Sequence, residues 1–165
     1  MRLGYTDYQA VLRKLLTLLD EEFGDEIRSI ALFGSVARGT ASATSDMDLL
    51  IVHQDGVQQI LDRFTDVAMR LRESEESQEL EAKGILAEPY PLFLTVTRLK
   101  KHPWILLDIA DHGIILRDHD EILAKELMAI RKRLEELGSI KVVLPDGTWY
   151  WDLKPDWKPG EVVEL

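Results

Sequence analysis

The sequence predicts an α/β (α+β) fold, in which helices flank a mixed β-sheet and a C-terminal helix and β-hairpin tail follow. Two observations carry this prediction. Helix-like and strand-like hydrophobic patterns alternate along the chain, and 45% of the 165 residues are hydrophobic, which is enough for a buried core. The length suits one domain better than two, so we expect a single domain over residues 1–165. Its core should span about residues 1–118, and its helix and aromatic tail residues 119–165.

Hydrophobic periodicity and turn residues place the individual elements. In chain order they predict a helix over 6–22, strands over 28–33 and 47–53, a helix from 57 that runs into an acidic stretch, a strand over 91–97, a short helix over 103–110, a strand over 113–117, a helix over 120–137 and a hairpin over about 142–151. In the first helix, Thr6 and Gln9 resemble a capping box. The run 49–52 is apolar on both faces, as in a central strand. We expect helices to cover the sheet mainly on one face.

Composition excludes several classes of protein and site. The chain has no cysteine, so disulfides, thiolate zinc sites and cysteine nucleophiles are excluded. A net charge of −10 argues against a protein that binds nucleic-acid backbones and favours a small or proteinaceous substrate. No apolar run could cross a bilayer and no secretion signal is seen, so we expect a cytoplasmic protein. Cysteine and asparagine are both absent, which is typical of proteins from thermophiles.

A phosphate-binding turn is predicted where the first strand ends. Gly34 and Ser35 follow that strand directly, and the chain then enters a predicted helix start. Glycine lets the backbone approach a ligand closely. The free N–H groups of a helix N-terminus, together with the Ser35 hydroxyl, can hold phosphate oxygens.

Two aspartates lead into the second strand. Asp46 and Asp48 are two residues apart, so their side chains should project from one face while Met47 points to the other. Neighbouring carboxylates repel each other unless a cation lies between them. Hard oxygen ligands suit Mg²⁺ or Mn²⁺, and a pair of ions about 3.5–4 Å apart could stabilise both the attacking and the leaving oxygen of a displacement.

Gly34-Ser35, ten intervening residues and Asp46-x-Asp48 together resemble the signature of the DNA polymerase beta superfamily of nucleotidyltransferases. Two short segments, Arg38-Gly39 and Ser45-Asp46-Met47-Asp48-Leu49, resemble the sequences of the minimal, stand-alone prokaryotic members of that superfamily. The resemblance implies the nucleotidyltransferase fold, with two catalytic Mg²⁺ or Mn²⁺ ions bound by the two aspartates. It assigns the bound nucleotide to four residues near the turn, the first two holding the β- and γ-phosphates: Gly34, Ser35, Arg38 and Ser45.

The resemblance also implies a third catalytic carboxylate on a later strand, where it could accept the proton of the attacking hydroxyl. The predicted strand over 91–97 contains no acid. Glu88 is the nearest candidate for this role. The acid-containing run 107–111 is interpreted as an ordinary helix end.

The resemblance implies transfer of a nucleoside monophosphate, AMP from ATP, to a hydroxyl acceptor. For the minimal members it further implies a small helical partner protein in a toxin–antitoxin pair, with a tyrosine of the partner as the acceptor. Three alternatives stay open. They are an aminoglycoside-type acceptor, a catalytically weak nucleotide-binding module that neutralises its partner by contact, and RNA 3′-end addition, which the acidity of the chain disfavours.

The C-terminal tail is rich in tryptophan, with Trp149, Trp151 and Trp157. These rings could stack on a base, dock a partner or simply cover the core. The sequence does not separate these alternatives.

Overall fold

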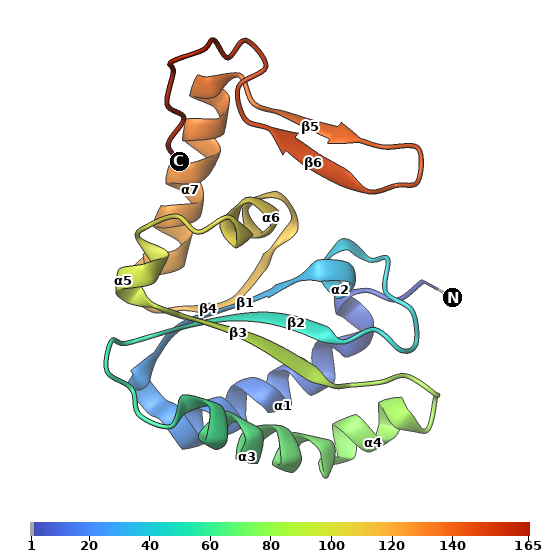
Figure 1. Cartoon of the computed structure of the whole chain (residues 1–165). Coiled ribbons are helices and arrows are strands. Elements are labelled where there is room, and N and C mark those ends of the chain that lie inside the picture. Colours follow the sequence, from blue (N-terminus) through green and yellow to red (C-terminus); the bar gives the residue numbers. More distant parts are fainter. Residues whose placement is uncertain (1) are drawn as a thin grey trace.

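Four strands form the central sheet of the computed structural model, which describes residues 2–165 (Figure 1). In spatial order they are β3 (Pro89–Thr95), β2 (Met47–His53), β1 (Ile27–Phe33) and β4 (Ile114–Asp118). β1 is antiparallel to both of its neighbours, whereas β2 and β3 are parallel. The sheet is therefore mixed, which confirms the predicted fold class.

One face of the sheet, the lower face in Figure 1, is covered by α1 (Tyr5–Phe23), α3 (Ile60–Arg72) and α4 (Glu75–Glu81). Leu49 and Ile51 of β2 point into this core and have no exposed surface. Phe64 of α3 stacks edge-on against Phe93 of β3, with ring centroids 5.5 Å apart. The core of this layer anchors the two strands that lead to the functional site.

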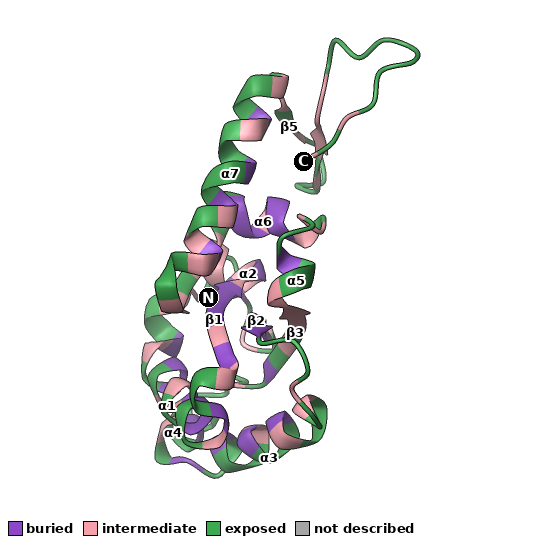
Figure 2. Ribbon diagram, turned by 90° about the vertical axis from the view of Figure 1, so that its left-hand side faces the viewer, coloured by how far each residue is buried: buried purple, intermediate pink, exposed green. Residues whose placement is uncertain are grey.

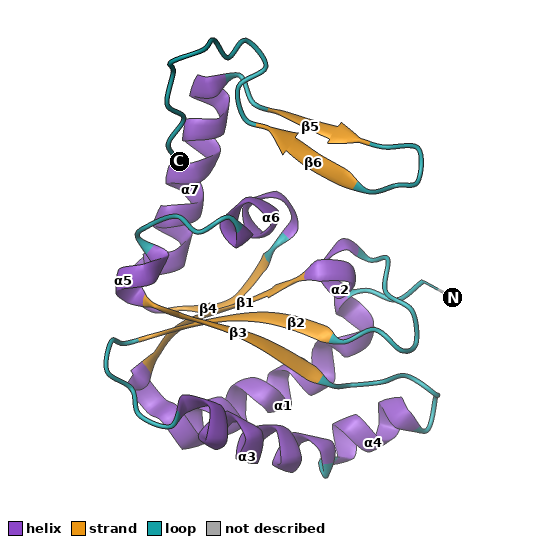
Figure 3. Ribbon diagram, in the orientation of Figure 1, coloured by secondary structure: helices purple, strands orange, loops and turns teal. Residues whose placement is uncertain are grey.

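The opposite, upper face is also covered. Figure 3 shows α5 (Val96–Leu99), α6 (Ile105–His112) and α7 (Ile122–Leu137) above the strands. Leu50 and Val52 of β2 point into this second core, together with Leu127 of α7. Figure 2 shows the buried residues of the helices turned toward the sheet. The expectation that helices cover mainly one face is wrong, because a central strand that is apolar on both sides needs an apolar partner on each.

The C-terminal residues form a hairpin of β5 (Ile140–Val143) and β6 (Trp149–Asp152) above α6 and α2 (Gly34–Arg38) (Figure 1). Cross-strand pairing puts Lys141 opposite Trp151. The chain then returns to α7, where the Arg133 Nε donates a hydrogen bond of 2.9 Å to the carbonyl oxygen of Glu164. No helix among residues 2–165 is long and apolar enough to cross a membrane.

Several predicted boundaries shift. The N-terminal cap of α1 is Gly4, whose N–H donates 2.8 Å to the Asp7 carboxylate, so the Thr6–Gln9 capping box is wrong. α3 begins at Ile60 and not at 57, and β3 and α6 are each displaced by two residues from the predicted 91–97 and 103–110. The four-residue helix α5 has no counterpart in the prediction.

Candidate active site

The turn between β1 and α2 brings the two predicted motifs into contact. Gly34 is buried and has a backbone φ of +69°, a left-handed conformation that favours glycine. A Cβ atom at this position would lie 1.9 Å from the Asp48 Oδ2 atom. The β1–β2 register explains this proximity, because Phe33 pairs with Asp48. Glycine is needed here for two reasons, its backbone conformation and its contact with the aspartate.

The helix that follows the turn is a single short turn, α2, whose first N–H groups have no partner within the helix. Ser35 lies at this end and is half-buried. Its carbonyl oxygen accepts a hydrogen bond of 3.0 Å from the Thr40 N–H, which fixes the loop beyond α2. The helix ends at Gly39 with φ of +70°. The N–H groups that lack a partner within α2 therefore follow directly after Gly34, the residue that contacts Asp48, and such groups can bind phosphate oxygens.

The two aspartates lie at the start of β2, as predicted. Asp48 is half-buried and Asp46, one residue before the strand, is exposed. Met47 between them is fully buried in the lower core. Burial and then the neighbouring charge of Asp46 raise the pKa of Asp48, whereas Arg38 lowers it. A carboxylate whose ionisation is opposed by burial and by a neighbouring carboxylate is suited to binding a cation.

Arg38, at the end of α2, joins this site to α6 and to the C-terminal hairpin. Its Nη1 atom lies 3.4 Å from the Asp108 Oδ2 atom, and its Cζ atom lies 4.7 Å from the centre of the Trp149 ring. The Lys141 Nζ atom lies 4.6 Å from the same ring. The arginine thus has a carboxylate and an aromatic face as partners.

Asp108 is a residue that sequence reasoning missed, because the run 107–111 was interpreted as an ordinary helix end. Its charge also raises the pKa of Asp48, although less than burial and Asp46 do. Its Oδ1 atom is buried without a hydrogen-bond partner among the described residues. The available signal was an acid between Leu107 and Ile109, two residues that a helix would bury.

Tyr8 of α1 is a second group that the sequence did not reveal, because it counted as one more apolar position of the helix. Its side chain has no exposed surface, and its hydroxyl has no hydrogen-bond partner within residues 2–165. Burial, followed by the charges of Asp7 and Asp46, raises its pKa. A neutral phenol therefore lies within electrostatic reach of the exposed aspartate.

Ser45 shapes the loop before the aspartates. Its Oγ atom accepts a hydrogen bond of 3.0 Å from the Ser42 N–H and lies 3.1 Å from the Ser42 Oγ atom. The same loop is tied to the N-terminus by a bridge between Leu3 and Ala41. The predicted contact of Ser45 with a nucleotide stays a prediction, and its hydroxyl serves here to fix the approach to β2.

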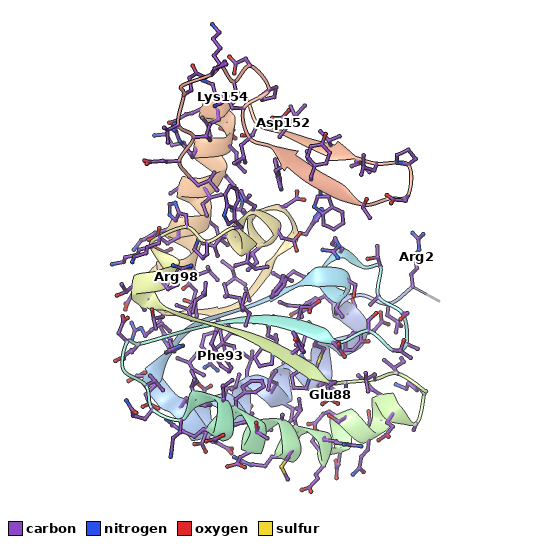
Figure 4. All side chains as sticks on the ribbon, viewed as in Figure 1. Arg2, Glu88, Phe93, Arg98, Asp152 and Lys154 are labelled. Carbon is purple, nitrogen blue, oxygen red and sulfur yellow. The ribbon has the colours of Figure 1, made fainter. Side chains whose placement is uncertain are left out.

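Glu88 does not join the two aspartates in one cluster. It is exposed and immediately precedes β3, where Figure 4 labels it, and its carbonyl oxygen accepts a hydrogen bond of 2.8 Å from the Met47 N–H. It also lines a cavity of about 210 Å³ on the α3 and α4 side. Among residues 2–165 there is no group of three or more histidine, aspartate or glutamate side chains placed to hold one metal ion. Its predicted catalytic role stays a prediction.

The donor set fits Mg²⁺ that arrives with a nucleotide better than a metal held by protein ligands alone. Asp46 and Asp48 supply hard oxygen donors at the end of the phosphate turn. Mg²⁺ commonly binds one or two carboxylates and fills its other positions with water and phosphate oxygens. Two aspartates beside the turn at Gly34, where phosphate binding is predicted, meet this requirement.

Known proteins resemble the chain along most of its length. The sequence profile of the nucleotidyltransferase domain family matches residues 12–145. A Methanocaldococcus jannaschii protein, named as a candidate protein adenylyltransferase, is 27% identical over 153 residues, which cover 93% of this chain and 95% of that protein.

Two crystal structures of toxin–antitoxin complexes also share similarity with the chain. One, a complex with AMP-PNP, is 18% identical, covers 75% of this chain and 89% of that one, and has a TM-score of 0.46. The other holds the tri-AMPylated Shewanella oneidensis HEPN toxin with the MNT antitoxin. It is 17% identical, covers 78% of this chain and 89% of that one, and has a TM-score of 0.45.

Proposed function

The chain belongs to the nucleotidyltransferase domain family, and from this premise we propose that it transfers AMP from ATP to a hydroxyl group of a protein. The observation that carries the proposal is the contact between Gly34 of the proposed phosphate-binding turn and Asp48 of the proposed metal-binding pair. The Asp48 carboxylate occupies the space that a side chain at position 34 would need. The M. jannaschii relative, aligned over nearly the whole chain, supports AMP as the transferred group and a protein as the acceptor.

In this proposal each part of the site has one task. Gly34 and Ser35 hold the β- and γ-phosphates through backbone N–H groups and a hydroxyl. Asp46 and Asp48 would hold Mg²⁺ or Mn²⁺, two ions in all, which when bound neutralise phosphate charge and stabilise the attacking and leaving oxygens. Arg38, within electrostatic reach of Asp48, supplies a further positive charge.

The reaction is a displacement at the α-phosphorus of ATP. The acceptor oxygen forms a bond to that phosphorus, the bond to the bridging oxygen breaks, and pyrophosphate leaves. The acceptor hydroxyl loses its proton to a base or to water. The site orients the triphosphate so that the attacking and leaving oxygens are in line.

We further propose that the acceptor is a tyrosine of a small helical partner protein, as in the minimal members that the motif resembles. The net charge of −10 supports a protein acceptor over a nucleic acid, since binding to phosphate backbones requires clustered cations.

Incubation with α-phosphate-labelled ATP, Mg²⁺ and the product of the neighbouring gene tests the proposal. Asp48→Asn keeps the side-chain shape but removes an anionic metal ligand, so AMP transfer should fall on the order of 10²–10³-fold. Asp66→Asn, the same change on the exposed surface of α3, is the matched control and should leave transfer unchanged. Undiminished transfer by folded Asp48→Asn protein would place the active site elsewhere. When an aminoglycoside is added to the same incubation, label on the aminoglycoside and none on the partner protein would refute the proposed acceptor.

A further inference from the structure

Tyr90, on the edge strand β3, lies beside Asp48. The parallel register of β2 and β3 pairs these two residues and continues without a shift from Met47 opposite Pro89 to His53 opposite Thr95. Neighbouring strands lie about 4.8 Å apart. Tyr90 is therefore the residue of β3 that lies directly beside Asp48 of β2.

Both side chains project from the upper face of the sheet. Side chains alternate along a strand, and Leu50 of β2 and Leu94 of β3 both pack in the upper core. Phe93, labelled in Figure 4, packs in the lower core. Even-numbered residues of both strands thus face upward, and this places Tyr90 and Asp48 on one side.

Tyr90 is accessible. Its side chain is 65% exposed, whereas Leu92, the next residue on the same face, is 36% exposed. β3 is an edge strand with β2 as its single neighbour in the sheet, so no further strand shields the ring. A tyrosine side chain is longer than an aspartate side chain, so from this register position the Tyr90 hydroxyl has the length to reach past the Asp48 carboxylate. An exposed tyrosine on a strand often reflects β-propensity alone, but its register with Asp48 is specific to this position.

From this geometry we propose that Tyr90 is an AMP acceptor within its own chain, so that the protein adenylylates itself. The inference rests on the proposed function. The Tyr90 oxygen forms a bond to the α-phosphorus of ATP bound at Gly34, the bond to the bridging oxygen breaks, pyrophosphate leaves and the phenolic proton passes to water. The product is a tyrosine O-AMP ester beside Asp48. An AMP group at that position occupies the acceptor side of the site, so the modified chain should lose transfer to other proteins.

The full-length protein, incubated with α-phosphate-labelled ATP and Mg²⁺, should gain the mass of a single AMP, and peptide mapping should place it on Tyr90. Tyr90→Phe keeps the ring and removes the attacking oxygen, so self-labelling should fall to background while transfer to the neighbouring-gene product persists. Tyr150→Phe is the matched control, because Tyr150 is also exposed, at 52%, but lies on the hairpin. That variant should label like the parent protein.

A mixing experiment tests whether the step is intramolecular. Asp48→Asn protein retains Tyr90 as an acceptor but lacks a metal ligand, and Tyr90→Phe protein retains the active site. If transfer occurs within one chain, their mixture should leave Tyr90 of the Asp48→Asn protein unlabelled, and the rate of labelling per chain should not depend on protein concentration.

The outcomes separate this inference from the proposed function. A protein that modifies its partner but carries no AMP on Tyr90, or carries it on another residue, overturns self-adenylylation and leaves the proposed function standing. Labelling of the Asp48→Asn protein in the mixture overturns the intramolecular step. No transfer to either acceptor overturns both proposals.

Discussion

Gly34→Ala is the substitution whose effect the structure defines most sharply. The new Cβ atom would lie 1.9 Å from the Asp48 Oδ2 atom, below the 3.0 Å under which such contacts essentially never occur. The carboxylate would have to retreat by about 1.1 Å. A misplacement of about 1 Å at a reacting centre can cost about 10²-fold in rate. We therefore expect AMP transfer to fall about 10²-fold.

The same substitution should destabilise the protein through two separate terms. A side chain at φ of +69° costs about 1–2 kcal/mol. Forcing an extra atom into a packed contact costs about 1–3 kcal/mol more. Gly138→Ala is the matched control, since Gly138 has φ of +65° and nothing within 4 Å of an added Cβ atom. Gly138→Ala should therefore incur only the backbone cost of about 1–2 kcal/mol. This cost corresponds to a Tm lower by about 2–8 °C for a chain of this size.

Thermal or urea unfolding of the parent and both variants, together with an AMP-transfer assay, measures both terms. Gly34→Ala should be less stable than Gly138→Ala, and only Gly34→Ala should lose transfer. Equal stabilities of the two variants, with transfer retained in both, would refute the contact between Gly34 and Asp48.

Two further predictions concern the charges of the site. Mg²⁺ should raise both the affinity for ATP and the Tm, because a ligand that binds only the folded state stabilises it. Calorimetry measures the ATP affinity. Equal affinity with Mg²⁺ and with excess chelator would contradict metal binding by Asp46 and Asp48. Because burial and Asp46 raise the pKa of Asp48, the folded state holds this proton more tightly than the unfolded chain. The stability of the metal-free protein should therefore fall as pH rises from the ordinary aspartate pKa through the raised value, and Asp48→Asn should remove this part of the pH dependence in unfolding experiments with chelator.

Most of the fold could be predicted because local patterns agree with the tertiary structure. The bounds of β2, Met47–His53, match the predicted strand, since its apolar run between a turn and a polar segment has the length of a strand and is too short for a buried helix. β3 begins at Pro89, two residues before the predicted strand over 91–97. Pro89 and Pro91 are tolerated because β3 is an edge strand and the alternate residues turn their missing N–H groups away from β2.

The candidate site was predictable where its residues are close in sequence. Gly34 and the two aspartates lie at opposite ends of the connection between the antiparallel strands β1 and β2. Their spacing in the sequence is therefore enough to predict that they lie close together. Asp108 approaches Arg38 only because α6 packs on the upper face of the sheet, and no local pattern specifies that packing. The third carboxylate was expected on β3, yet the position in register with Asp48 is Tyr90.

The tryptophans of the tail show why residue type alone could not decide their roles. Trp151 packs on the upper core, so it covers apolar surface. Trp157 is 52% exposed, and its Nε1 donates 2.9 Å to the Glu161 carbonyl oxygen within the C-terminal segment. Trp149 lies against Arg38, the same cation that lowers the pKa of Asp48. Since a cation over an aromatic face is stabilised by about 0.5–2 kcal/mol, the hairpin helps to hold the Arg38 side chain in place. The tail therefore holds a cation that acts on the charge of Asp48, although it lies outside the sheet that carries this residue.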